Sequence, residues 1–175
     1  MTRCPTAPTA LAEFRQFWHQ NCSKLTQSWS RRSGAVSHRL KLEDVVCEVA
    51  PSRTRARVQL RNSGLTHVGL ASSRTEGEDW HAVVAQATVN AIRMYVGFAG
   101  VQMRLALGVV KIVSDPRPVV LVSVTAESQG KELSLVGSAP MRDEPQRAVA
   151  RAVLQALNRQ IEGIAPTDPR LPVPS

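Results

Sequence analysis

The stretch DEPQRAVARAVLQALNRQIEG, residues 143–163, decides the fold because the chain contains the same pattern twice. The stretch EDWHAVVAQATVNAIRMYVG, residues 78–97, begins 65 positions earlier and has the same layout. In both, an acidic lead-in precedes apolar residues spaced three and four apart, which places them on one face of a helix. Residues of the first helix precede their counterparts in the second by 65 positions: Ala85, Ala87, Val89, Ala91 and Ile92 precede Ala150, Ala152, Leu154, Ala156 and Leu157. We therefore predict two helices, over residues 78–96 and 143–161, related by an internal duplication.

Three strand-like segments come before each helix. They cover residues 42–49, 54–61 and 66–72 in the first half, and residues 105–113, 118–126 and 131–138 in the second. The turn signals NSG (62–64) and ESQG (127–130) separate the second segment from the third in each half. Ala56, Val58 and Leu60 precede Val120, Val122 and Val124 by 64 positions, whereas Val68 and Leu70 precede Leu133 and Leu135 by 65. We place this one-residue change in the turn.

This order of elements predicts an α+β fold with two pseudo-symmetric β-β-β-α units over residues 39–163. A single unit would leave a sheet edge and much apolar surface exposed, so we expect the two units to pack against each other. Internal twofold symmetry of this kind creates a crevice at the junction, where a ligand or a second copy of the chain can bind.

An N-terminal extension, residues 1–38, is expected to precede this domain. Residues 1–41 carry seven of the 22 basic residues but only one of the 14 acidic residues, so most of the formal net charge of +8 belongs to this end. Between Thr9 and Ser30 the apolar residues recur every three or four positions, which predicts an amphipathic helix. Its apolar face, with Phe14, Trp18 and Trp29, is expected either to fold back on the body or to dock onto a protein partner. Residues 164–175 are predicted to form a flexible, Pro-rich tail.

Cysteine spacing and hydropathy bear on the location of the protein. Cys4, Cys22 and Cys47 are an odd set without CxxC or CxxH spacing, which argues against a disulfide framework and against a zinc site. No stretch approaches the ~18 apolar residues of a membrane span, and no signal-peptide core is recognisable near the N-terminus. We expect a cytoplasmic protein without a membrane span.

The second half also resembles a known family. VSVTAESQGKELSLVGSA (122–139) is similar to a hairpin and third strand of the C-terminal regulatory, dimerisation domain of 2-isopropylmalate synthase and citramalate synthase. Asp143 stands where that family often carries an acidic residue, and ALN (156–158) resembles the usual ending of its helix. The resemblance covers about residues 40–163 and implies an allosteric domain that dimerises and binds a small effector such as a branched-chain amino acid. The catalytic barrel of the synthases has no counterpart in these residues, so we expect a stand-alone, non-catalytic module.

The starts of the two helices are the first candidate ligand site. The residues concerned are Glu78, Asp79, Trp80 and His81 at the first helix and Asp143 with Glu144 at the second. Carboxylates and a histidine in one place can bind a ligand or transfer a proton. A solvated helix end is the structural alternative, because acidic residues are favoured there by the helix dipole.

An arginine stripe is the second candidate. Arg53, Arg55, Arg57 and Arg61 alternate with apolar residues, which places them on one face of a strand. That face could hold phosphates or a carboxylate, or it could be the solvated face of a charged strand. Together with the basic N-terminal segment it supports an alternative function, association with nucleic acid.

The sequence contains none of the common catalytic or nucleotide-binding motifs that we considered. No P-loop, GxGxxG, HExxH or GxSxG pattern occurs, and we assign no catalytic residue, metal ligand or cofactor. We expect a non-enzymatic homodimer with a small-metabolite effector as the leading hypothesis.

Overall fold

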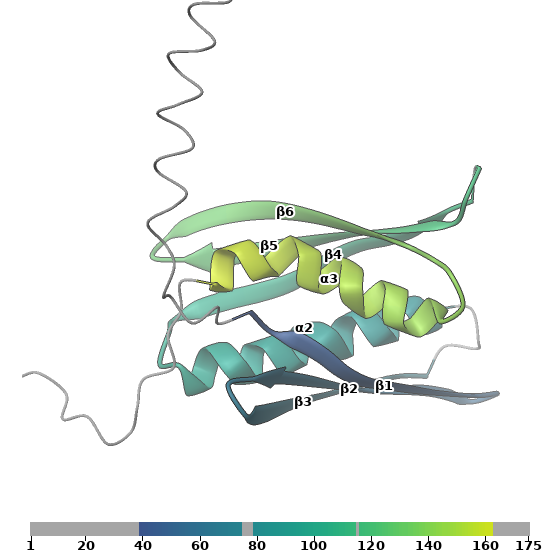
Figure 1. The fold of residues 1–175 in the computed structure, drawn as a ribbon, viewed down its shortest axis with the longest axis horizontal. Helices are drawn as coiled ribbons and strands as arrows, with labels where there is room; N and C mark the ends of the chain where they lie inside the picture. Colours follow the sequence, from purple (N-terminus) through teal and green to yellow (C-terminus); the bar gives the residue numbers. More distant parts are fainter. Residues whose placement is uncertain (1–38, 75–78, 115, 163–175) are drawn as a thin grey trace, which may run out of the picture. The chain divides into compact units, whose positions relative to one another are not determined.

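The computed structural model describes residues 39–74, 79–114 and 116–162. Two antiparallel three-stranded sheets and two helices make up this part of the chain, which confirms the α+β class (Figure 1). The first unit contains β1 (Lys41–Ala50), β2 (Arg53–Asn62), β3 (Leu65–Ser73) and α2 (Trp80–Phe98). The second contains β4 (Met103–Val113), β5 (Val119–Ser128), β6 (Lys131–Pro140) and α3 (Pro145–Ile161). The expected N-terminal helix with Phe14, Trp18 and Trp29, the helix-start residue Glu78 and the Pro-rich tail lie outside the described residues.

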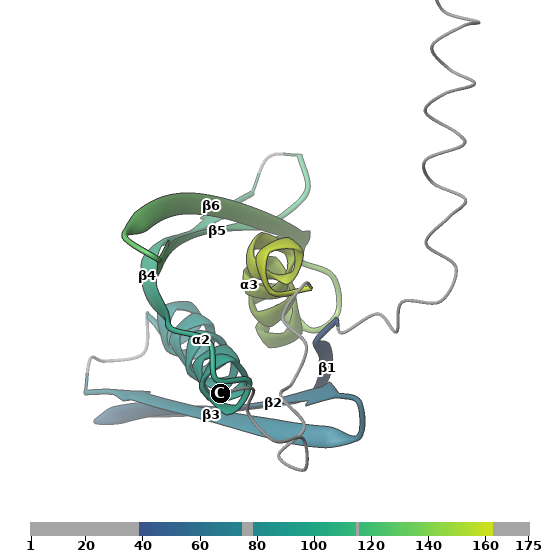
Figure 2. The ribbon, with the colours of Figure 1, turned by 90° about the vertical axis from the view of Figure 1, so that its left-hand side faces the viewer.

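The two helices lie between the two sheets, so that each sheet has one face toward the core and one toward solvent (Figure 2). Helix α2 packs on β2 and β3, and α3 packs on β5 and β6. Each helix also contacts the first strand of the other unit, because α2 reaches β4 and α3 reaches β1. The two units therefore share one hydrophobic core, as expected from the apolar surface that a single unit would leave exposed.

A bulge in the first strand of each unit accompanies this exchange of contacts. The pairing of β1 with β2 shifts between Leu42 and Asp44, and that of β4 with β5 shifts between Leu107 and Val110. Such bulges bend a strand and increase its twist. The beginnings of both strands bend toward the helix of the other unit, and Leu40 and Leu105, 65 positions apart, are each 2% exposed.

Two equivalent hydrogen bonds tie these strand beginnings to the helices. Arg93 in α2 donates from Nε to the carbonyl oxygen of Leu105 at 3.1 Å. Asn158 in α3 donates from Nδ2 to the carbonyl oxygen of Leu40 at 3.5 Å. Both donors and both acceptors are 65 positions apart, so the duplication extends to the links between the units.

The hairpins turn through two residues with left-handed backbone conformation. Ser63 and Gly64 have φ of 48° and 87°, and Gln129 and Gly130 have φ of 53° and 72°. Positive φ at both central positions is typical of the type I′ turn, which matches the twist of the flanking strands. The predicted turn signals are confirmed by their position in the structure.

The third strands of the two units do not correspond in the way that the sequence comparison of the two halves predicts. Gly69 pairs with Val58 and Gly137 pairs with Val122, so equivalent residues of β3 and β6 are 68 positions apart rather than 65. The β5–β6 hairpin is longer than the β2–β3 hairpin by two residues on each strand. The segment from Gly137 to the start of α3 is three residues shorter than the segment from Gly69 to the start of α2. Val68 and Leu70 consequently face solvent and correspond to Val136 and Ser138. Their match to Leu133 and Leu135, and the placement of the length change in the turn, were wrong.

Candidate functional site

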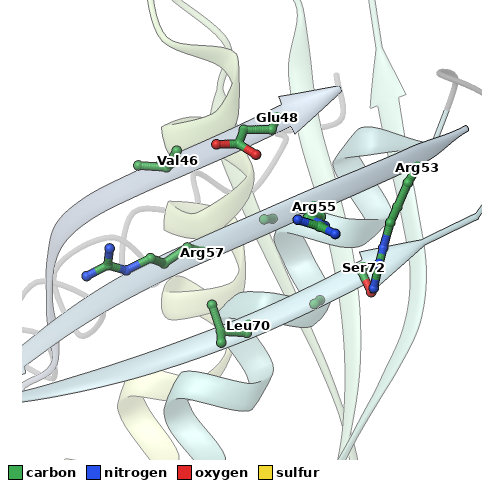
Figure 3. A pocket seen from close by; sticks show the side chains of 9 residues that line it. Val46, Glu48, Arg53, Arg55, Arg57, Leu70 and Ser72 are labelled. Atoms are coloured by element: carbon green, nitrogen blue, oxygen red, sulfur yellow. The ribbon is translucent and has the colours of Figure 1, made fainter. Parts of the chain in front are cut away.

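The predicted arginine stripe lies on the outer face of the first sheet. Along β2, the exposed Arg53, Arg55, Arg57 and Arg61 alternate with buried residues that face the core, which confirms the predicted alternation. Because β2 is the central strand, side chains of β1 and β3 flank the arginines on both sides. Figure 3 shows Val46 and Glu48 on one side and Leu70 and Ser72 on the other, around a shallow groove. We call this surface the arginine face.

The four arginines of this face differ in their partners. Arg53 donates to the Ser72 hydroxyl oxygen at 3.1 Å, and Arg61 forms an ion pair with Glu43 at 3.2 Å. Within the described part of the chain, Arg55 and Arg57 have no carboxylate oxygen within 4.0 Å. Beside them the aliphatic side chains of Val46 and Leu70 are 43% and 64% exposed. Glu48 also lines this groove, and the Gln59 amide oxygen can accept a hydrogen bond from Arg57. Two guanidinium groups without a close carboxylate, beside aliphatic side chains, can take up an anionic group that carries a small apolar substituent.

The helix-start residues are divided between two helices that enter from the same end of the molecule (Figure 1). Asp79 and Glu144 occupy the N-cap positions of α2 and α3, and neither side chain accepts a capping hydrogen bond. Glu144 instead forms an ion pair with Arg147 at 3.2 Å. Trp80 is half-buried against the core and stacks edge-on against His81, with ring centroids 5.8 Å apart. The exposed Asp143 precedes Glu144 at the start of α3, whereas the aromatic pair lies at the start of α2.

Two titratable groups in the core have shifted pKa values. Burial lowers the pKa of His67, whose ring packs edge-on against Tyr95 with centroids 5.3 Å apart. Burial also raises the pKa of the Tyr95 hydroxyl. Both shifts favour the neutral forms. The contact between the two rings joins β3 to α2. In β1, burial followed by the charge of Glu48 raises the pKa of the half-buried Cys47 thiol. A raised pKa makes this thiol a poor nucleophile.

Sequence reasoning missed the outer face of the second sheet. The outward side chains at the centre of β5 and β6 are all uncharged: Leu121, Ser123 and Thr125 on β5, and Ser134, Val136 and Ser138 on β6. We call this surface the hydroxyl face. Its positions correspond to Arg57, Gln59, Arg61, Thr66, Val68 and Leu70 of the first sheet. The alternation of β5 already indicates its outward residues, but only the observed pairing of β5 with β6 identifies the residues of β6 that lie on the same face.

Comparison of the sequence with protein-family models and with curated proteins gives no match. Among the described residues, no helix combines the length and the apolar character that a membrane span requires. The same residues contain no group of three or more His, Cys, Asp or Glu side chains placed to hold a metal ion.

Proposed function

We propose that the chain is a non-catalytic regulatory and dimerisation module, similar in organisation to the regulatory domain of 2-isopropylmalate synthase. Two copies associate through the hydroxyl face. The observation that carries this proposal is the difference between two sheets of the same architecture. Where the first sheet presents Arg57 and Arg61, the second presents Leu121 and Thr125.

The hydroxyl face suits contact with an identical copy of itself. In a twofold dimer the same patch occurs on both sides, so each residue meets residues of its own surface. The four arginines of the arginine face would repel those of a second copy in that arrangement. The hydroxyl face is uncharged at its centre, and Lys111 of β4, opposite Leu121, borders it. Depletion of charge is also the compositional mark of interface centres. Val136, which is 70% exposed, would lose the most contact with water on association.

Dimerisation is tested by placing one charge on each sheet. Val136→Glu is expected to weaken the dimer at least about a hundredfold, roughly 2.7 kcal/mol, because it buries one added carboxylate from each copy in an interface whose centre is uncharged. Val68→Glu is the matched control, since Val68 occupies the equivalent position on the first sheet and is 38% exposed. Sedimentation velocity over a range of protein concentrations measures both variants.

The control separates a specific interface from a general effect of charge. The proposal requires a dimeric parent, a monomeric Val136→Glu variant and a dimeric Val68→Glu variant. A parent that stays monomeric at all concentrations would exclude self-association. Equal behaviour of the two variants would remove the hydroxyl face from the interface.

The arginine face is then free to bind the effector. A branched-chain amino acid or its keto acid would place its carboxylate at Arg55 and Arg57 and its side chain at Val46 and Leu70. This location differs from the helix starts, which remain a separate prediction. What supports it is a pair of arginines that have no carboxylate oxygen within 4.0 Å in the described part of the chain and that lie beside exposed aliphatic side chains.

Effector binding is measured by thermal denaturation with and without branched-chain amino acids and keto acids. At ~100 times the dissociation constant a ligand stabilises the folded state by about 2.7 kcal/mol, which raises Tm by roughly 5–10 °C in a chain of this size. The double variant Arg55→Gln/Arg57→Gln should abolish this increase without lowering the Tm of the free protein. An undiminished increase in that variant would place the effector elsewhere, the helix starts being the next candidate.

A further inference from the structure

A row of basic side chains runs along the solvent-facing side of α3. Arg147, Arg151 and Arg159 are separated by four and eight residues, and Gln155 occupies the remaining position of the same row. Residues four apart lie about 6 Å from one another along a helix. Lys41, the first residue of β1, and Arg39, two residues before it, line a groove together with this row. We call the groove lined by these five basic residues the α3 groove.

Three of the five cations lack a compensating charge. Arg39 forms an ion pair with Glu162 at 3.2 Å, and Arg147 forms one with Glu144 at 3.2 Å. For Lys41, Arg151 and Arg159, no carboxylate oxygen of the described residues lies within 4.0 Å. All three of these residues are exposed. The α3 groove therefore carries positive charge that no ion pair of the described residues neutralises.

The duplication shows that the fold does not require these cations. The counterparts of Arg147, Arg151 and Arg159 in α2 are Ala82, Gln86 and Met94, each 65 positions earlier. Beside α2, the basic residues Arg93 and Arg104 line a pocket that extends over β4, β5 and β6 and that also contains Glu127 and Glu132. There Arg93 is engaged by the Leu105 carbonyl oxygen, and Arg104 lies 3.9 Å from Glu127. The same backbone arrangement thus carries a basic row on only one of its two copies.

We propose that the α3 groove binds the phosphate backbone of a nucleic acid strand. The charges form a line rather than a point, and the stretch from Arg151 to Arg159 spans about 12 Å of helix. Guanidinium groups form paired hydrogen bonds with phosphate oxygens. Among the described residues that line the groove none is aromatic, so these residues offer bases no stacking platform. Binding is therefore independent of sequence and depends on phosphate contacts.

The acidic helix start does not oppose this binding. Repulsion by the carboxylates would apply to a phosphate placed at the N-terminus of α3. The row instead lies along the side of the helix, and Glu144 is already paired with Arg147. Arg147 also donates to the Glu43 carbonyl oxygen at 3.4 Å, which joins this end of α3 to β1. The site differs from the arginine face, on which sequence reasoning placed the nucleic-acid contacts.

The test compares two double variants of the full-length chain, Arg151→Gln/Arg159→Gln and Arg55→Gln/Arg57→Gln. Each removes two exposed arginines, so the net charge changes equally. Fluorescence anisotropy with a labelled DNA duplex and a labelled single strand, at several salt concentrations, gives the affinity and its salt dependence. Thermal denaturation confirms that both variants are folded. Polyglutamate as an unlabelled competitor distinguishes a phosphate site from a site for acidic protein segments.

The expected result is a selective loss in the α3 variant. Its affinity should fall at least tenfold at low salt, and the slope of log K against log[salt] should become less steep by about 1.4–1.8, the value for two phosphate contacts. The proposal is overturned if the α3 variant binds like the parent protein or if both double variants lose affinity equally. It is also overturned if polyglutamate competes as well as unlabelled nucleic acid of the same charge.

Discussion

Replacing Gly69 with alanine is expected to lower the free energy of unfolding by about 3 kcal/mol, with a fall in Tm of roughly 6–12 °C. An added Cβ atom at Gly69 would meet the backbone of α2, with the Ala91 Cα only 2.9 Å away and the Ala87 carbonyl oxygen closer still. Backbone atoms of a packed helix cannot rotate away as a side chain can, so β3 and α2 would have to separate. Thermal and urea denaturation of the variant measure the loss.

Gly137 provides an independent repetition of this experiment. Its added Cβ would lie 2.7 Å from the Ala156 backbone nitrogen, and closer to the Ala152 carbonyl oxygen. Gly137→Ala should therefore destabilise the protein as much as Gly69→Ala does. Gly97→Ala is the control, because an added Cβ at that exposed helical position meets nothing within 4 Å. It should be neutral or stabilise by up to about 1 kcal/mol. A small effect at Gly69 or Gly137, similar to that at Gly97, would contradict the close packing of strand and helix.

These glycines also explain why the correspondence between β3 and β6 could not be predicted from the sequence. Val68 and Leu70 look like core residues by composition, and Gly69 between them looks like a weak strand position. The need for glycine is apparent only when a helix lies against it, which is a tertiary contact. Once Gly69 and Gly137 are matched, the inward and outward positions of β3 exchange places. An error of an odd number of residues reverses the faces of a strand.

The elements themselves could be predicted because their signals are local. Helical spacing placed α2 and α3 within two residues of their actual ends, and the turn signals placed both hairpins. The alternation of β2 placed its four arginines on the outer face. Each of these inferences needs only the geometry of one element or one turn.

The candidate surfaces depend on how the elements are combined, and local patterns say little about that. Arg147, Arg151 and Arg159 are visibly spaced in the sequence, but Arg39 and Lys41 join them only because β1 crosses to the helix of the other unit. The hydroxyl face likewise requires the pairing of β5 with β6. The contacts of β1 with α3 and of β4 with α2 form only when the two repeats pack into one core, so the sequence of a single element does not predict them.

The shared core leads to the second large effect, at a pair of equivalent helix residues. Leu157→Ala is expected to lower the free energy of unfolding by about 3 kcal/mol, and Ile92→Ala by a similar amount. Both side chains are fully buried, and their positions are 65 apart. Met94→Ala on the exposed side of α2 is the control and should change stability by less than about 0.5 kcal/mol. Urea denaturation followed by circular dichroism measures the three variants.

Which sheets lose stability in these variants is more informative than the size of the loss. If α2 and α3 belong to one core, Leu157→Ala must weaken the first sheet although the residue lies in the second unit. Hydrogen exchange of the native protein tests this directly, because amide protection reports local and global opening. Protection in β2 and in β5 should fall by the same free energy in both variants. If Leu157→Ala lowered the protection of β5 and left β2 unchanged, the two units would be independent folding units in contact. In that case the hydrogen bonds from Arg93 to Leu105 and from Asn158 to Leu40 would connect two units that unfold separately.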